Sequence, residues 1–312
     1  KKNPKNQSKA FFMKTPKWFL KKNLIAFLLL PVSWVYYVFS RLVYYMRKGK
    51  ALKSRRKIIC VGNILAGGVG KTPIVKQIAN YFDAPVVMRG YKKSESTGGI
   101  GDEAAMLARA GIAVHVGDRV SNVILLNNQN DAVGPIVMDD GLQNPTIEKD
   151  ISLIVFDEAI GYGNGFLLPA GPLRATKRSA KNADAIIVIR SKNPKKRFKL
   201  PKKVPVFYAE NKTISPYDED MPLVAFAGIG YPKKFFDSLD NVVVTRAFPD
   251  HWDYTNDDIV QLFELANDCN ACLVTTEKDW VRLPKIVQDK IKYARLDTVI
   301  EDKFWDWIKE KL

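Results

Sequence analysis

Short apolar segments recur between residues 57 and 279, and polar or glycine-containing stretches separate them. Compact runs rich in Val, Ile and Phe are typical of β-strands that are buried on both faces of a sheet. Ten segments of this type predict strands, at residues 57–63, 84–88, 112–116, 135–140, 151–158, 183–190, 204–210, 223–230, 242–248 and 272–279.

Segments with helical character lie between several of these strands: from Thr72 to Phe82, after Pro232, after Asn256 and at the C-terminal end. Strands that alternate with helices favour a parallel sheet covered on both faces, which is an α/β fold. A polar stretch near residues 212–221 interrupts the alternation. The prediction is therefore a larger α/β domain at 58–211 and a smaller α/β domain at 212–312.

The N-terminal region has a different pattern. An uncharged apolar run extends from Leu24 to Phe39, and after Arg41 it continues to Met46. A membrane-spanning helix needs about 20 mostly apolar residues, and Pro31 would kink it. Residues 1–57 are therefore expected to form a membrane anchor, either a single span or a deeply inserted helix. The alternative is a buried core helix.

The charge distribution supports the membrane interpretation. The net charge is +16, and residues 1–57 hold sixteen Lys or Arg but no Asp or Glu. Of the 49 basic residues, 33 remain in the rest of the chain, where they face 33 acidic ones. A nucleic-acid-binding protein would carry its basic patch on the folded domain, so no nucleic-acid partner is expected. A basic, apolar terminus suits an anionic lipid surface instead.

A glycine-rich loop follows the first predicted strand and opens the first predicted helix. Glycines allow backbone N–H groups to point at phosphate, and the helix N-terminus adds partial positive charge. In such a loop Lys71 would reach the β- and γ-phosphates of ATP, and Thr72 would bind Mg²⁺. The strict pattern requires Gly at position 65, where this chain has Leu65, and a turn without a ligand is the alternative. The predicted nucleotide-binding residues are Gly67, Gly68, Val69, Gly70, Lys71, Thr72 and Pro73.

The predicted strand at 135–140 ends in two carboxylates, Asp139 and Asp140. An apolar strand that ends in acids is the expected second element of a P-loop site, where it holds Mg²⁺ or its water. A simple turn is the alternative for an Asp-Asp-Gly sequence. Behind a P-loop, the metal role for Thr72, Asp139 and Asp140 is favoured.

Two further positions are candidates for acid–base chemistry. Asp102 lies at a predicted helix start, where helix capping is the alternative explanation for an acidic residue. His251, between Asp250 and Asp253, follows a predicted strand, and functional residues of α/β sheets gather at strand ends. From the pattern alone a role for His251 stays open.

Together these strings resemble the tetraacyldisaccharide 4′-kinases of lipid A biosynthesis. The matching pieces follow one another in order over residues 61–283, and they are VGNILAGGVGKTP, RGY, GDEA, GDR, DDGLQ, GNGFLLPAGPLR, AFAGIG, FPDHWDY and TTEKDWVRL. The family also has an N-terminal membrane segment.

The resemblance implies a P-loop domain and a smaller α/β domain with the active site between them. It implies transfer of the γ-phosphate of ATP to the 4′-hydroxyl of a tetraacylated glucosamine disaccharide 1-phosphate, which gives lipid IVA. It also implies that Asp102 and His251 act as a base dyad beside the catalytic Lys71. The expected location is the cytoplasmic face of the bacterial inner membrane, and the oligomeric state is left open.

The sequence departs from the family at two positions. Ala175 replaces the acid that commonly follows the arginine of PLR, and Asn144 replaces a histidine after DDG-x-Q. Two other functions stay possible: a membrane-bound P-loop ATPase or GTPase, and an adaptor with a vestigial loop. The segment Glu277-Lys278-Asp279 lacks the spacing of a guanine-reading motif. Intact Lys71 and Thr72 argue against the adaptor.

Overall fold

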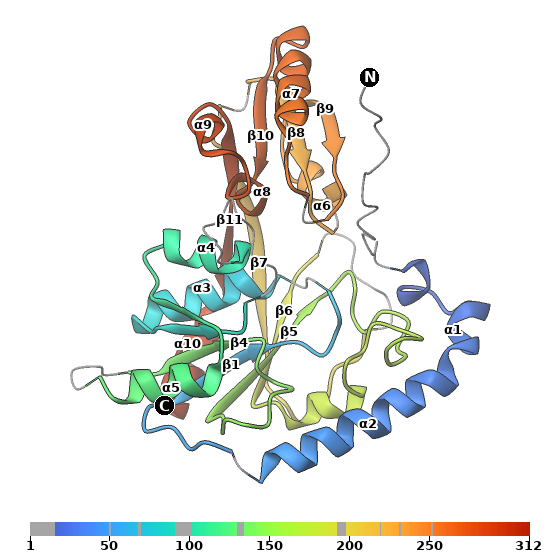
Figure 1. The fold of residues 1–312 in the computed structure, drawn as a ribbon, viewed down its shortest axis with the longest axis vertical. Coiled ribbons are helices and arrows are strands. Elements are labelled where there is room, and N and C mark those ends of the chain that lie inside the picture. The colour runs from blue at the N-terminus through green and yellow to red at the C-terminus, as the bar shows by residue number, and fades with distance from the viewer. Residues whose placement is uncertain are drawn as a thin grey trace, which may run out of the picture.

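The computed structural model describes residues 16–49, 51–67, 70–90, 101–129, 134–191, 198–218, 220–230, 232–250 and 252–312. In this part of the chain, eleven strands form one sheet in the order β3-β2-β4-β1-β5-β6-β7-β11-β10-β8-β9 (Figure 1). The strands are β1 (Ile58–Gly62), β2 (Val86–Met88), β3 (Val114–Val116), β4 (Ile136–Asp139), β5 (Ile151–Asp157), β6 (Ala185–Ile189), β7 (Val206–Ile214), β8 (Leu223–Ala227), β9 (Val242–Ala247), β10 (Cys272–Thr276) and β11 (Lys292–Ile300).

Helices surround this sheet. They are η1 (Lys17–Phe19), α1 (Leu24–Leu28), α2 (Leu30–Lys48), α3 (Lys71–Phe82), α4 (Asp102–Arg109), α5 (Arg119–Asn127), η3 (Lys177–Asn182), α6 (Pro232–Phe236), α7 (Asn256–Asp268), α8 (Glu277–Trp280), α9 (Lys285–Gln288) and α10 (Asp302–Lys311). In Figure 1, α7 and α9 lie around the upper strands, whereas α3, α4, α5 and α10 lie around the lower ones.

Strand pairing is parallel except at one place. β7 and β11 run antiparallel, with register pairs from Arg295↔Ile214 to Ile300↔Ala209. The fold is therefore a mixed, mostly parallel α/β sheet, and the α/β class predicted from the sequence is confirmed. The ten predicted strands all form, but β11 was missed and lies between β7 and β10.

The order of strands positions the chemistry. β1 lies between β4 and β5, and Val61 of β1 pairs with Asp139 of β4. Because the pair is parallel, both strands end on the same side of the sheet. The glycine-rich loop after β1 and the two carboxylates after β4 are therefore neighbours, as ligand sites of α/β sheets require.

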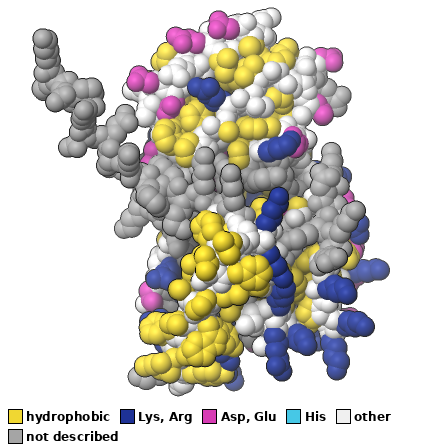
Figure 2. All heavy atoms as spheres, turned by 90° about the vertical axis from the view of Figure 1, so that its right-hand side faces the viewer, with side chains coloured by type: hydrophobic (Ala, Val, Ile, Leu, Met, Phe, Trp, Pro, Cys, Tyr) yellow, Lys and Arg dark blue, Asp and Glu magenta, His cyan; other side chains and the backbone are white. Residues whose placement is uncertain are grey.

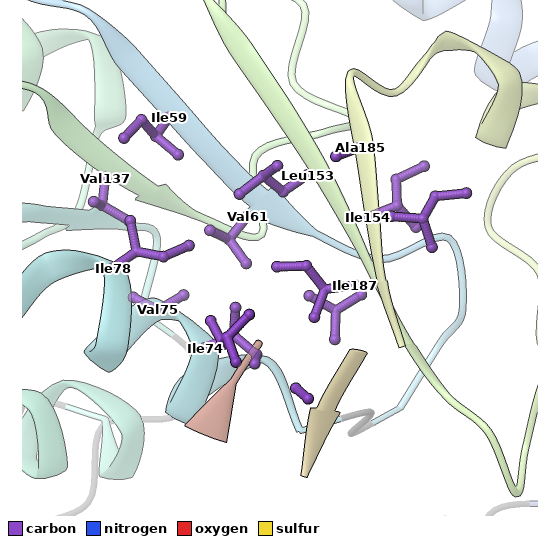
Figure 3. Packing of buried hydrophobic residues seen from close by; sticks show 14 of the residues in the cluster. Ile59, Val61, Ile74, Val75, Ile78, Val137, Leu153, Ile154, Ala185 and Ile187 are labelled. Atoms are coloured by element: carbon purple, nitrogen blue, oxygen red, sulfur yellow. The ribbon is translucent and has the colours of Figure 1, made fainter. Parts of the chain in front are cut away.

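Helix α3 is fixed by its apolar face. Ile74, Val75 and Ile78 are completely buried against Val61 of β1 and Val137 of β4 (Figure 3). Their spacing of one and four residues places the side chains on one side of a helix. This packing fixes the start of α3, where Lys71 lies.

The second half of the sheet has its own cores. One cluster, which includes Phe226, Leu262 and Trp280, joins β8, α7 and α8, and another on β8 and α6 includes Phe235. Two observations bear on the predicted boundary between residues 211 and 212. β7 crosses it, and Phe304 and Ile308 of α10 are buried in the first core. The division into domains stays a prediction, with α10 contributing to the core of the larger part.

The N-terminal apolar run, which was predicted to be a single membrane span or a deeply inserted helix, forms two helices and not one. The apolar run is divided into α1 and α2, and Pro31 occupies the first turn of α2. Proline lacks the N–H that would continue a preceding helix, so it favours a new helix start. Among the described residues, no helix combines the length and the apolar character needed to cross a bilayer.

Instead, α1 and α2 contact the segment 164–171 of the larger part. The Ser33 hydroxyl of α2 donates to the carbonyl of Leu167 at 3.0 Å and accepts from the N–H of Ala170 at 3.0 Å. Phe27 of α1 meets Phe166 edge to face, with ring centroids 5.5 Å apart. The other sides of these helices are exposed and apolar.

Candidate functional site

The glycine-rich loop links β1 to α3. Gly67 and Gly70 have φ angles of 113° and 78°, in the left-handed region that favours glycine. The backbone carbonyl of Asn63 accepts from the amide of Gln143 at 2.8 Å, so the loop is tied to the segment after β4. Gly68 and Val69 lie outside the described residues. The described part has the strand–loop–helix geometry that the sequence predicts.

Lys71 lies in the first turn of α3 and faces the end of β4. Its Nζ is 3.4 Å from Oδ1 of Asp140, and NH1 of Arg174 is 2.8 Å from Oδ2 of the same carboxylate. These cations hold the pKa of Asp140 below its usual range, against the desolvation that raises it. Two positive groups thus converge beside the helix N-terminus, as the binding of a polyphosphate requires.

The backbone of the two carboxylate residues is held by Arg119, the first residue of α5. Its guanidinium donates to the carbonyl oxygens of Asp139 at 2.8 Å and Asp140 at 3.1 Å. Asp140 needs this support because its φ angle is 52°, which is uncommon for a residue other than glycine. Strained backbone of this kind is concentrated at functional sites.

Asp139 is enclosed. Burial, together with the negative charges of Glu103 and Asp140, raises the pKa of Asp139 to about 7, although Lys71 and Arg119 oppose the shift. Its Oδ1 is buried and has no hydrogen-bond partner among the described residues. A buried carboxylate oxygen without a partner is costly, so this oxygen fits a cation.

The donor set suits Mg²⁺. Asp139, Asp140 and the half-buried Thr72 supply hard oxygen ligands at the end of β4 and the start of α3. Mg²⁺ is held by one or two carboxylates together with substrate phosphates. The described residues contain no group of three or more His, Cys, Asp or Glu that could hold a metal, and a phosphate-bridged magnesium site needs none.

Asp102 is the first residue of α4 and is buried, with 7% of its side chain exposed. Its Oδ2 lies 3.4 Å from Nε of Arg282, which follows α8. The neighbouring residue, Glu103, is near enough to Asp139 for its negative charge to raise the pKa of that carboxyl. The start of α4 therefore lies between the carboxylates at the end of β4 and the smaller part of the sheet. His251, the proposed partner of Asp102, lies outside the described residues.

Sequence reasoning missed three arginines. Arg119 and Arg174 are part of the GDR and LLPAGPLR strings, and Arg282 is part of TTEKDWVRL, but no role was predicted for any of them. The available signal was the position of Arg119 and Arg174 in strings that accompany the P-loop. Arg282 also lies in one of the matching strings, but its contact with Asp102 depends on the strand order and could not be predicted.

The two departures have structural explanations. Ala175 packs against the first hydrophobic core, and an alanine brings no carboxylate to the site. The side-chain oxygen of Asn144 accepts from the N–H and the hydroxyl of Thr146, at 2.9 and 2.7 Å, and stabilises the turn after the carboxylates. Among the described residues, Lys71 and Asp140 make their ion pairs with each other and with Arg174, and not with Ala175 or Asn144.

Comparison with known sequences gives one consistent result. A family model described as Tetraacyldisaccharide-1-P 4′-kinase matches residues 25–312. A protein of Rickettsia bellii named Tetraacyldisaccharide 4′-kinase is 34% identical over 86% of this chain and 89% of its own length. A protein of the same name from Rhodopseudomonas palustris is 34% identical over 93% of each chain.

The fold is shared with a solved structure. A crystal structure of LpxK from Aquifex aeolicus in complex with ATP superposes with a TM-score of 0.70 and 22% identity. The match covers 92% of this chain and 99% of that one, so the similarity extends over both parts of the sheet.

Proposed function

Because the chain belongs to the tetraacyldisaccharide-1-P 4′-kinase family, we propose that it transfers the γ-phosphate of ATP to the 4′-hydroxyl of a tetraacylated glucosamine disaccharide 1-phosphate, giving lipid IVA. The observation that carries the proposal is the ion pair between Lys71, in the first turn of α3, and Asp140, which directly follows β4. ATP is the phosphate donor.

Different residues of the phosphate site bind the phosphates and the metal ion. Phosphoryl transfer needs positioning and charge neutralisation more than covalent chemistry by the protein. Lys71 and Arg174 supply the positive charge, and the N-terminus of α3 supplies backbone N–H groups. Thr72, Asp139 and Asp140 would hold Mg²⁺, which on binding would neutralise charge on the β- and γ-phosphates.

The acceptor hydroxyl needs a base. We assign this role to Asp102, with His251 orienting it or raising its proton affinity. Support comes from the burial of Asp102 at the start of α4 and from its neighbour Glu103, whose negative charge raises the pKa of Asp139. The base is thus close to the phosphate site, but it lies on α4, whereas Lys71 lies on α3. The ATP site and the site of the lipid hydroxyl can therefore be formed by different elements.

The acceptor is a lipid, so we propose that the enzyme works at a membrane surface, on the cytoplasmic face of the bacterial inner membrane, where ATP is available. Support comes from the face formed by α1 and α2, where exposed apolar side chains gather beside Lys and Arg (Figure 2). Amphipathic helices with basic flanks insert into the headgroup region. The segment that holds these helices, 164–171, continues to Arg174 in the phosphate site.

Membrane attachment should depend on this face. Leu24, Leu28, Trp34 and Phe39 are 75%, 69%, 68% and 66% exposed. Replacing all four with Ser is expected to abolish co-sedimentation with phosphatidylglycerol–phosphatidylethanolamine vesicles in high salt, where charge attraction is screened. ATP affinity should stay unchanged. The matched control, Ile286→Ser, removes an exposed apolar residue of the smaller part, and it should still sediment. Sedimentation of the fourfold variant would place attachment elsewhere.

The catalytic proposal has a direct assay. The purified protein is incubated with [γ-³²P]ATP, Mg²⁺ and the tetraacylated disaccharide 1-phosphate, and the lipid fraction is separated by thin-layer chromatography. We expect label in a more polar lipid, and loss of that product when EDTA removes Mg²⁺. Release of inorganic phosphate without labelled lipid would instead indicate an ATPase.

A further inference from the structure

Arg282 is a fully enclosed cation in the smaller part of the sheet, with 1% of its side chain exposed. Its guanidinium donates to three backbone carbonyls: Nε to Lys278 at 3.1 Å, NH1 to Trp252 at 2.9 Å and NH2 to Gly228 at 3.0 Å. These carbonyls lie in three chain segments, and arginine presents its donors in a planar fork. The side chain therefore has one fixed orientation.

Asp279 balances the charge of Arg282 and makes the arrangement rigid. It is completely buried, and its Oδ1 lies 2.5 Å from NH2 of Arg282. The same carboxylate accepts from the N–H of Gly228 and the hydroxyl of Tyr254, both at 2.9 Å, and from the hydroxyl of Thr276 at 2.6 Å. Burial raises the pKa of Tyr254, so its hydroxyl stays protonated and donates. Networks satisfied in this way resist rearrangement.

The same guanidinium reaches beyond the smaller part of the sheet. Its Nε is 3.4 Å from Oδ2 of Asp102, at the start of α4. Ala105 and Met106 of α4 pack against the second core, and Arg109 lies over the ring of Trp280 at 4.1 Å. Other residues of α4, among them Leu107, belong to the first core. Helix α4 therefore contacts both the smaller part and the first core.

We infer that Arg282 is a positioning residue for phosphoryl transfer: it fixes the carboxylate of Asp102 on the rigid network of the smaller part. The inference rests on the proposed role of Asp102 as the base. Trp252, whose carbonyl Arg282 also holds, follows His251 directly in the chain. A misplacement of about 1 Å can lower a rate by about 100-fold, so a base on a separate element needs such a contact.

Arg282→Lys tests the inference. Lysine keeps the charge but cannot present a fork of donors, so the Asp102 carboxylate should lose its fixed position. We expect kcat to fall about 10- to 100-fold, as a misplaced group predicts, with the KM for ATP nearly unchanged. The matched control is Arg109→Gln, which removes another contact between α4 and the smaller part and should leave kcat near the wild-type value. An equal loss of kcat in both variants would indicate general docking of α4 and would overturn the inference.

A double-mutant cycle with Asp102→Asn separates the possible explanations. If Arg282 acts through the carboxylate, Arg282→Lys should lower kcat little further in the Asp102→Asn background. If the two fold-losses in kcat instead multiply in the double variant, Arg282 acts independently of Asp102, and the inference fails. If Asp102→Asn lowers kcat and Arg282→Lys does not, only the inference fails. If neither variant lowers kcat, the base assignment fails as well.

Arg282 is buried, so the melting temperature and ATP affinity of Arg282→Lys are measured first. If this variant does not fold, a crystal structure of the wild-type enzyme with an ATP analogue gives the answer. An Arg282–Asp102 ion pair in that complex supports the inference, and a guanidinium turned away from Asp102 contradicts it.

Discussion

Replacing Lys71 with Ala should reduce kcat/KM by about 100- to 1,000-fold, the effect of removing one preorganised charge contact from a transition state. The structure gives the reason. Lys71 Nζ lies at the N-terminus of α3, 3.4 Å from Asp140, which is also bound by Arg174. The variant leaves Asp140 with one cation and removes the group expected to reach the γ-phosphate.

The measurement is steady-state turnover with varied ATP, beside a melting curve to show that the variant folds. Lys76→Ala is the matched control, because Lys76 is a half-buried lysine of the same helix. Among the described residues, the ion pairs of Asp140 are with Lys71 and Arg174 and not with Lys76. It should keep nearly full activity. Wild-type turnover by Lys71→Ala would refute the P-loop assignment, and equal losses in both variants would indicate a helix defect.

The parts of the site that lie within one stretch of chain could be predicted from the sequence. The loop around Lys71 directly follows a strand and opens a helix, so its geometry is local. Asp139 and Asp140 end an apolar strand in the same way. That these two stretches are neighbours follows from the pairing of β1 with β4, which the P-loop interpretation implied.

The parts that depend on distant pairing could not be predicted. β11 contains Lys292, Arg295 and Asp297 and has no continuous apolar run, so its pattern does not indicate a strand. Its extended form is imposed by pairing with β7 and β10 on its two sides. Strand preference depends on such surroundings more than on the residue itself.

Contacts between single side chains could not be predicted from the sequence either, because they also depend on distant pairing. Arg174 meets Asp140, and Arg282 meets Asp102, across separations set by the order of the whole sheet. The apolar run does not form one continuous helix for a local reason, since Pro31 starts a new helix and the buried Ser33 docks it on the protein. A pattern of apolar residues does not distinguish a helix that crosses lipid from one that covers a protein and exposes its other side.

Asp102→Ala and His251→Ala should each lower kcat about 100- to 10,000-fold, the usual contribution of a general base, while ATP affinity changes little. Asp102 is buried at the start of α4, where its carboxylate lies 3.4 Å from Nε of Arg282 in the smaller part of the sheet. Removing its carboxylate therefore leaves Lys71, Arg174 and the carboxylates of β4 in place. His115→Ala, which changes the only other histidine of the chain, is the matched control and should stay active.

The double variant decides whether the two residues form a dyad. Residues that act as a unit are not additive, so Asp102→Ala/His251→Ala should be barely slower than the slower single variant. Multiplied losses in kcat would mean that the residues act independently. A loss of ATP affinity alone in Asp102→Ala would assign that carboxylate to the nucleotide or metal site, where Glu103 already influences Asp139. The base would then have to be Asp139 or Asp140, and the rise in the pKa of Asp139 to about 7 makes Asp139 the first of these to test with Asp139→Asn.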